Sequence, residues 1–198
     1  MPIAVASHPA ELPRDAHRKL TRADCEALAE AGLLDWERFE LIDGELIPKM
    51  PKSPLHTLTL LLLVEWLREV FGARYVRQEA PIDLPVSLHP INEPEPNAAV
   101  LWGPAESFRT RNPAPTDIRL VAEVTVTTQD YDLGAKAALY ASAGIVEYWV
   151  LDLADQRIVV HRDPRAGEYG SIVAYSADED VSPLASPATF VRLATLLG

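Results

Sequence analysis

Apolar and polar positions along the chain predict three helices with short strands between them. Thr21 is a suitable N-cap for a first helix that runs to about Ala31, and Gly32 provides a natural stop. The dipeptide Asp43-Gly44 lies between two short apolar runs, which is typical of a tight hairpin. The chain therefore predicts a helix followed by a hairpin in its first quarter.

The second predicted helix is apolar around most of its circumference. Ser53 as N-cap and Pro54 as first helical residue open it, and Gly72 ends it. Such a helix is buried on several sides or lies at a subunit interface, so we expect a homodimer. A membrane span needs about 20 apolar residues, whereas the longest apolar run, 58–64, ends at Glu65. The pattern therefore predicts no membrane association.

The rest of the chain predicts a mixed sheet. The expected strands are 74–84 (one or two), 98–102, 118–126, 145–153, 157–162 and 171–175, with a further one late in the chain. The two longest central ones are apolar on both faces, as strands covered on both sides are, and a helix over 130–142 separates them. This order predicts an α+β fold, a mixed β-sheet flanked by helices, in a single domain over 20–198 after a loose segment 1–19.

Composition narrows the class of protein. The 198 residues are 48% hydrophobic and 24% charged, which excludes a disordered chain and a small disulfide scaffold. The net charge of −11 weighs against a protein that coats nucleic acid, because phosphate would be repelled. The one cysteine, Cys25, allows no internal disulfide, and residues 1–20 hold no apolar run of signal-peptide length. We therefore expect a cytoplasmic protein.

One carboxylate interrupts an otherwise apolar strand. Glu123 lies among valines and an alanine, where a charge costs several kcal/mol unless it is paired or bound to a cation. A buried salt bridge, or a strand end that reaches water, explains it without a function. Asp132, Lys136 and Tyr140 are spaced by four on one face of the following helix, where a solvated ion pair is the simple alternative.

Further oxygen donors flank the predicted sheet. Glu45 follows the hairpin turn, and Glu93, Glu95 and Asn97 precede the strand over 98–102. Each alone fits a surface carboxylate or an acidic, proline-stiffened loop. Together with a lysine on the following helix, such groups can hold a hard divalent cation and orient or deprotonate a water. The combination predicts metal-assisted phosphodiester hydrolysis.

Six blocks of sequence carry a family resemblance. In chain order they are AGLLDWERFELIDGELI, SPLHTLTL, RQEAPIDL, EPEPNAAVL, LVAEVTVTTQDYDLGAKAALYASAGIVEYWVLD and RIVVHRDP. They run from about Leu20 to the C-terminus, and in this order they resemble the Uma-two family of "putative restriction endonucleases", part of the PD-(D/E)xK nuclease superfamily. The resemblance implies a restriction-endonuclease-like core, a homodimer, DNA as substrate, and Mg²⁺ or Mn²⁺ as cofactor.

The resemblance also implies roles for individual residues. Glu45 matches a catalytic and metal-binding glutamate, Glu123 the second metal carboxylate, and Lys136 the catalytic lysine, moved onto the helix. The family has a proline-aspartate dipeptide where this chain has proline followed by Asn97. An amide offers a metal an oxygen without a charge, so we expect weak metal affinity. Glu95, two residues earlier, is a candidate replacement for the missing carboxylate.

Several polar positions are candidates for auxiliary roles. His56 and Gln78 match recurring polar positions of the family, and Asp132 and Tyr140 match the residues that flank the lysine. Lys52 and His56 lie at the start of the second helix, whose free N–H groups could seat a phosphate; simple capping is the alternative.

The region 85–117 is the candidate for sequence specificity, because no second recognition domain is visible. Arginines in and near it are candidates for contacts with a nucleic-acid backbone and are equally explained as surface charge; they are Arg74, Arg77, Arg109 and Arg111.

Three functional hypotheses follow. The first is a Mg²⁺-dependent DNA endonuclease of the restriction type. The second is a catalytically weakened or inactive relative, with Asn97 in place of the metal aspartate, that binds nucleic acid or protein as a dimer. The third is an unrelated hydrolase that uses two glutamates as acid and base, but it leaves Lys136 without a role. A metal-dependent cleavage assay separates the first two.

Overall fold

A six-stranded sheet forms the centre of the molecule in a computed structural model that describes residues 18–49 and 51–198. The described residues contain eight strands, six of which form this sheet. The eight are β1 (Phe39–Ile42), β2 (Glu45–Pro48), β3 (Val76–Gln78), β4 (Ala98–Leu101), β5 (Ile118–Thr125), β6 (Glu147–Asp152), β7 (Arg157–Arg165) and β8 (Glu168–Ser176). The strand order is β3-β4-β5-β6-β7-β8, and β5 and β6 run parallel while the other neighbours are antiparallel. Strands β1 and β2 form a separate antiparallel hairpin.

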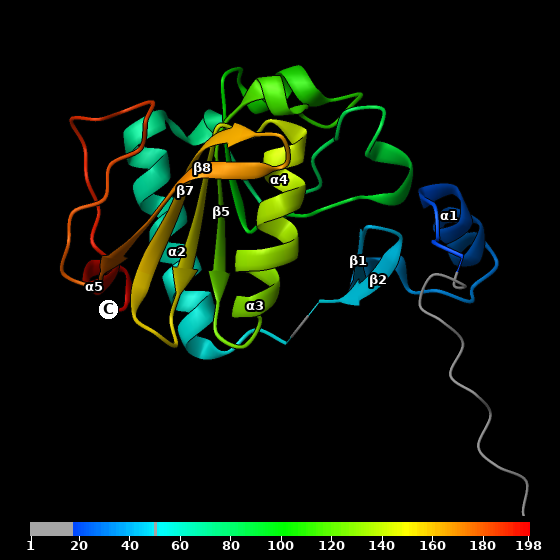
Figure 1. The fold of residues 1–198 in the computed structure, drawn as a ribbon, viewed down its shortest axis with the longest axis horizontal. Helices are drawn as coiled ribbons and strands as arrows, with labels where there is room; N and C mark the ends of the chain where they lie inside the picture. Colours follow the sequence, from blue (N-terminus) through cyan, green and yellow to red (C-terminus); the bar gives the residue numbers. More distant parts are fainter. Residues whose placement is uncertain (1–17, 50) are drawn as a thin grey trace, which may run out of the picture.

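Helices cover both faces of the sheet (Figure 1). They are α2 (Pro54–Phe71), α3 (Gln129–Tyr131), the π-helical segment η7 (Asp132–Lys136), α4 (Ala137–Ala143) and α5 (Leu193–Leu196). Helix α1 (Arg22–Glu30) lies apart from the sheet, beside the β1–β2 hairpin. The buried leucines of α2 pack with α5 on one face, around Trp149 of β6. Tyr140 of α4 packs on the other face, around Tyr148. This arrangement confirms the predicted α+β single domain with a mixed sheet.

Local signals in the sequence account for most element ends. The Thr21 side chain accepts from Asp24 N and forms a capping box at α1, and Ser53 accepts from His56 N, 3.1 Å away, at α2. Asp43 and Gly44 have φ of 49° and 77°, the pair of positive angles that a two-residue hairpin turn requires. These predicted starts and turns are confirmed.

Three elements differ most from the prediction. The strand expected in 74–84 is only β3, because Pro81 and Pro85 break the backbone pairing that follows it. The helix expected over 130–142 is α3, η7 and α4 in succession, with a π-turn in its middle. The strand expected late in the chain is an isolated bridge between Val181 and Val191. The predicted loose segment 1–19 lies almost wholly outside the described residues.

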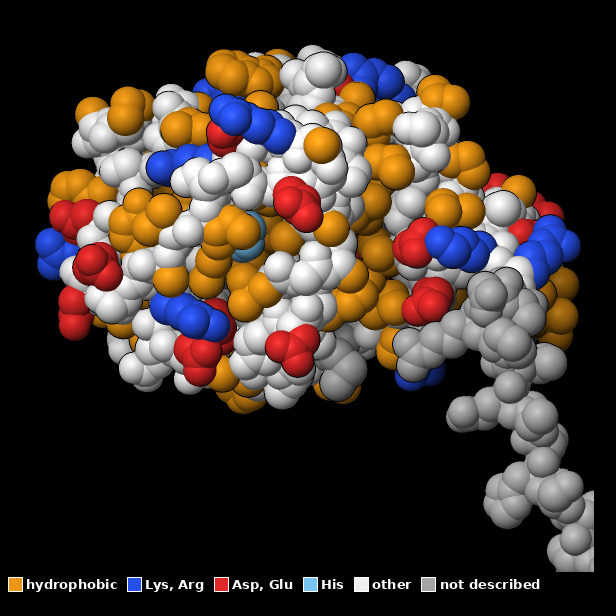
Figure 2. Space-filling model, viewed as in Figure 1, with side chains coloured by type: hydrophobic (Ala, Val, Ile, Leu, Met, Phe, Trp, Pro, Cys, Tyr) orange, Lys and Arg blue, Asp and Glu red, His pale blue; other side chains and the backbone are white. Residues whose placement is uncertain are grey.

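The outer face of α2 remains at the surface of the single chain. Leu60, Leu63 and other inner residues are buried, whereas Leu55, Leu58 and Leu61 are 41%, 40% and 50% exposed. Of the two alternatives predicted for α2, burial on several sides does not hold within one chain, and a place at a subunit interface stays a prediction. On the face drawn in Figure 2, charged side chains of both signs are scattered among apolar ones. None of the described helices is long and apolar enough to cross a membrane.

Candidate active site

A cavity of about 390 Å³ lies between the β1–β2 hairpin, the start of α2, and the π-helical segment η7. Its ionisable lining, apart from His56 and Tyr131, is six carboxylates and three lysines: Glu37, Glu40, Glu79, Glu95, Glu123, Asp132, Lys49, Lys52 and Lys136. The carboxylates thus exceed the lysines by three. Such a cavity favours a cation and repels a bare phosphate.

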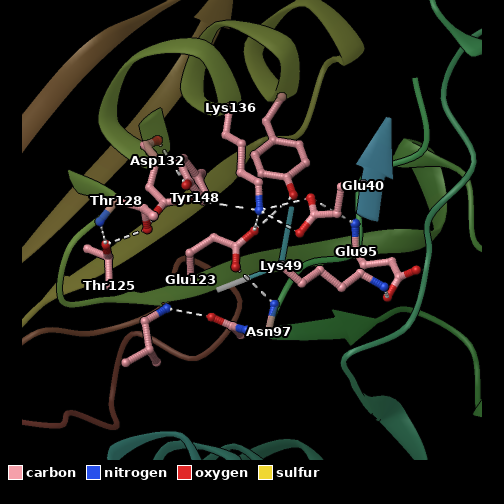
Figure 3. Close-up of polar contacts among 12 residues, drawn as sticks. Glu40, Lys49, Glu95, Asn97, Glu123, Thr125, Thr128, Asp132, Lys136 and Tyr148 are labelled. Carbon is pink, nitrogen blue, oxygen red and sulfur yellow. Dashed lines mark hydrogen bonds and ion pairs between the residues drawn. The ribbon is translucent and has the colours of Figure 1, made fainter. Parts of the chain in front are cut away.

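Glu123 and Lys136 form a buried ion pair on the wall of this cavity (Figure 3). Glu123 lies on β5, covered on both faces, and its Oε1 is 2.9 Å from Nζ of Lys136. Tyr140 donates its hydroxyl to the same oxygen, at 3.2 Å, and the backbone N–H of Asn97 donates to Oε2, at 3.1 Å. Three donors therefore hold the carboxylate, which explains how a charge is tolerated within a central strand.

The π-helical turn determines how Lys136 is presented. A π-turn widens the helix by one residue per turn, and such turns recur at functional sites. Here it begins at Asp132 and ends at Lys136. Tyr148 donates its hydroxyl to the Asp132 carbonyl, at 3.0 Å, and Thr128 donates to the Asp132 carboxylate, at 2.7 Å. The turn is therefore anchored both to the sheet and to the loop that precedes the helix.

Glu40 of the hairpin completes the cluster around the lysine. Its Oε2 lies 3.0 Å from Lys136 Nζ, and Asp132 Oδ1 lies 3.9 Å from the same nitrogen. One ammonium therefore faces three carboxylates, of which Glu123 and Asp132 are almost fully buried. Glu40 was not among the residues predicted from sequence, although it shares the signal that singled out Glu123: a carboxylate within a short apolar strand.

The ionisation of the cluster follows from burial and charge. Burial raises the pKa of Glu123 to about 7, against the opposing pull of the Lys136 charge. Burial also raises the pKa of Asp132. Burial by itself lowers the pKa of Lys136. The negative charges around it outweigh this effect and raise the pKa above its ordinary value; they belong to Glu123, Glu40 and Asp132. The lysine is therefore held as a cation, while Glu123 can exchange a proton near neutral pH.

Asn97 lies opposite Glu123, at the start of β4. Its side-chain oxygen accepts from the backbone N–H of Val124, at 2.8 Å, so the amide is oriented by β5. The neighbouring carboxylate, Glu95, pairs with Lys49 at 2.7 Å. The structure thus brings Asn97, Glu123 and Lys136 together, and Glu95 faces the same cavity with its charge matched by a lysine.

A divalent cation suits the donors in this cavity only in part. Carboxylate and amide oxygens are the ligands that Mg²⁺ prefers, and carboxylates are in excess here. Within residues 18–49 and 51–198, however, no three His, Cys, Asp or Glu side chains form a cluster that could hold a metal ion. Lys136 lies between the carboxylates of Glu40 and Glu123, and position 97 offers a neutral oxygen. The residues therefore fit a weakly held cation rather than a preformed metal site.

The structure places Glu45 and Gln78 outside this cluster. Glu45 is exposed and pairs with Ile42, two positions along the hairpin from the Glu40–Ile47 pair. Two strand positions correspond to about 7 Å, which is enough to move its carboxylate from the cavity to the turn. Gln78 is exposed at the end of β3 and does not line the cavity. The sequence-based interpretation of Glu45 as a member of the cluster is therefore corrected in favour of Glu40.

At the start of α2, the groups that were expected to bind a phosphate already have partners within the protein. Lys52 pairs with Glu79, and Ser53 accepts from the His56 backbone N–H. His56 lines the cavity, and burial together with the charge of Lys52 lowers its pKa. These contacts support capping, the simpler of the two predicted alternatives.

Comparisons with known proteins agree with this architecture. Residues 25–195 match the Uma2 family, whose description is "Putative restriction endonuclease". The fold is similar to the crystal structure of "a putative nuclease belonging to DUF820" from Anabaena variabilis ATCC 29413, with a TM-score of 0.62. The match has 17% sequence identity and covers 85% of this chain and 94% of that one, so it supports the fold alone. No match is found among curated proteins.

Proposed function

We propose that this chain, which belongs to the Uma2 family of "putative restriction endonucleases", hydrolyses phosphodiester bonds in DNA with the help of a divalent cation. The observation that carries the proposal is the buried contact of 2.9 Å between Glu123 and Lys136 on the wall of an acidic cavity. A buried, strongly perturbed acid and base in one cleft are typical of a catalytic site.

Glu123 serves as the proton acceptor in this proposal. With a pKa of about 7, its carboxylate can take a proton from a water molecule as the water oxygen forms a bond to phosphorus. The bond to the leaving oxygen breaks in the same displacement, and that oxygen takes a proton from solvent. Tyr140 and the Asn97 backbone N–H keep the carboxylate aimed into the cavity.

Lys136 acts by its charge. Because three carboxylates hold it as a cation, it cannot serve as the base, but it can stabilise negative charge on a phosphoryl oxygen. A divalent cation held by oxygens of Glu40 and Asn97 would supply the positive charge that lets a phosphate enter this cavity. Its affinity would be low, since one of the two donors is neutral and Glu123 is engaged as the proton acceptor.

Cleavage of supercoiled plasmid with Mg²⁺ or Mn²⁺ tests the proposal. We expect nicking by the natural chain, more readily with Mn²⁺, and its loss in Glu123→Gln and Lys136→Met. Glu45→Gln is the matched control, because it removes a carboxylate from the same face of the hairpin but outside the cluster. The proposal fails if the Gln and Met variants cleave as well as the control.

A second candidate rests on Asn97. Its amide oxygen is oriented by the Val124 N–H, so position 97 has a structural role that needs no metal. A relative of the nucleases that binds nucleic acid without cleaving it would keep this geometry. Binding of plasmid without nicking under any divalent cation would favour this candidate over the enzyme.

We also propose a homodimer. Leu55, Leu58 and Leu61 lie on the outer face of α2, and each is at least 40% exposed. Solvated leucines in a row along a long helix are typical of a surface that is covered by a partner.

A further inference from the structure

We propose that a second surface, away from the cavity, binds single-stranded nucleic acid by stacking a base on Trp102. We call this surface the Trp102 patch, and its members are Phe71, Tyr75, Trp102, Phe108, Arg74, Arg109, Arg111 and Arg119. It is built where the end of α2, the turn η3 (Ala73–Tyr75), the turn η5 (Ala105–Phe108) and the start of β5 meet. In Figure 1 this is the upper edge of the molecule, at the green loop that follows β4.

A guanidinium enclosed by aromatic rings forms the floor of the patch. Arg119 lies 4.4 Å from the centroid of the Trp102 ring, 5.7 Å from that of Phe71 and 5.8 Å from that of Tyr75. Its Nε is buried without a hydrogen-bond partner. No carboxylate of the described residues lies within ion-pair distance of it, so the faces of the rings are the nearest groups that attract its charge.

Trp102 is the exposed element of the patch. More than half of the residue, 56%, is accessible even though the ring rests on Arg119. A guanidinium beneath an indole fixes the plane of the ring, which prepares it as a platform. Stacking on such a platform tolerates any base, because every base has a π-face. An exposed, oriented indole therefore favours a flat aromatic ligand over an aliphatic one.

The charge of the patch suits an anionic polymer. Two of its four arginines are paired with carboxylates: Arg74 with Glu106 at 2.8 Å, and Arg111 with Asp117 at 2.6 Å. A third carboxylate, Asp83, also acts on Arg111. The patch thus keeps an excess of one positive charge in a chain whose net charge is −11. Arg111 also lies 5.0 Å from the centroid of the Phe108 ring, which repeats the pairing of arginine with an aromatic ring. Arginine next to aromatic rings is the combination that single-strand binding proteins use.

The patch is separate from the candidate active site. Arg119 precedes Glu123 by four residues on β5, which corresponds to about 13 Å along a strand, and no patch residue lines the cavity. The inference therefore goes beyond the proposed cleavage, because binding here needs neither the cavity nor a metal. A single strand is favoured over a duplex, since only unpaired bases expose their faces for stacking.

Fluorescence anisotropy of a labelled 15-nucleotide oligo(dT), titrated with the full chain in EDTA at low salt, tests the inference. We expect saturable binding that Trp102→Ala weakens by roughly tenfold or more, with Trp102→Phe intermediate, as stacking predicts. Phe190→Ala is the matched control, because Phe190 is equally exposed at 56% and lies outside the patch. We expect the control to bind like the natural chain.

Two further measurements distinguish base stacking from purely electrostatic binding. In Arg109→Ala/Arg111→Ala, the slope of log K against log salt should become shallower by about 1.4 if both contact phosphates. A duplex of the same length should bind more weakly than the single strand. The inference is overturned if no oligonucleotide binds, if Trp102→Ala binds like the natural chain, or if the duplex or heparin competes equally well. Because EDTA prevents cleavage, these outcomes are independent of whether the chain is a nuclease.

Discussion

The Lys136 ammonium lies 3.0 Å from a carboxylate oxygen of Glu40, although 96 residues separate the two in the chain. Glu40 belongs to the β1–β2 hairpin, and Lys136 ends the π-turn behind β5. The contact therefore joins two parts of the molecule that no strand pairing connects. It also shows that the hairpin forms a wall of the cavity.

Glu40→Gln should impair any cleavage while leaving the fold intact. The amide keeps the shape of the side chain but removes one of the three negative charges around Lys136, so we expect a fall in rate of about 10- to 100-fold. Initial rates of plasmid nicking measure the effect. Glu45→Gln, on the same face of the hairpin, should retain the natural rate. Equal rates for both variants would remove Glu40 from the site.

Stability should fall as pH rises through the range in which Glu123 ionises. The pKa of this group is raised from 4.5 to about 7, so between these values the folded chain binds more protons than the unfolded chain does. The loss of unfolding free energy is about 3 kcal/mol and is complete above about pH 7. Urea titrations at pH 5 and pH 8 measure it. Glu123→Gln should show a smaller difference between the two pH values, and an equal difference would contradict the assignment.

Lys136→Met should destabilise the protein strongly. It leaves Glu123 and Asp132 buried without their cation, which typically costs about 3–5 kcal/mol. Adding Glu123→Gln to this variant should restore part of the loss, because the uncompensated charge is then gone. A double-mutant cycle by chemical denaturation measures the coupling. Strictly additive effects would show that the two charges are not coupled.

Asn97→Asp should strengthen the binding of divalent cations. A carboxylate oxygen can still accept from the Val124 N–H, and the side chain gains the negative charge that a hard cation prefers. Calorimetric titration of Mg²⁺ and Mn²⁺ into both proteins, with plasmid nicking alongside, provides the comparison. Tighter binding with cleavage only in the aspartate variant identifies a decayed nuclease. Cleavage by the natural chain that the change does not increase would show that another group, such as Glu95, already supplies the charge.

If the proposed homodimer forms, Leu61→Glu should convert it to a monomer. Leu61 is 50% exposed on the outer face of α2, so a charge there is tolerated by the single chain but not inside an apolar interface. Light scattering at micromolar concentration distinguishes the two states. Leu33→Glu, at an exposed position far from α2 in sequence, is the control. A natural chain that is already monomeric would end the dimer proposal.

Much of the fold is predictable because its signals are local. Ser53 and Pro54 specify the start of α2, Asp43-Gly44 specifies a turn with two positive φ angles, and the apolar run around Glu123 specifies a central strand. Each depends on a few neighbouring residues. Consequently the helix starts, the hairpin and the central strand of the sheet follow from the sequence.

Other features depend on contacts between distant segments, and sequence patterns do not reveal them. Glu40 and Glu45 occupy the same face of one hairpin, and only the docking of that hairpin decides which of them reaches Lys136. The π-turn likewise begins at Asp132, whose carbonyl accepts a hydrogen bond from the distant Tyr148, a contact that a helical periodicity cannot encode. The sequence therefore could not show that Glu40 is the third carboxylate beside Lys136, or that the helix after β5 contains a π-turn.

The attachment of the hairpin has a consequence for how the protein is handled. Its backbone hydrogen bonds outside the hairpin run to Leu20, which donates to Gly44, and to the loop at residues 91–93, where Gly44 donates to Ile91 and Glu93 donates to Leu41. None of these bonds reaches the six-stranded sheet. Such a peripheral unit can open at a lower free energy than the sheet, and its amide protons should exchange with solvent sooner than those of β5. A purified sample can therefore keep a native circular dichroism spectrum after its cavity has lost a wall, so native-state hydrogen exchange of β1 and β2 is the better measure of an intact preparation.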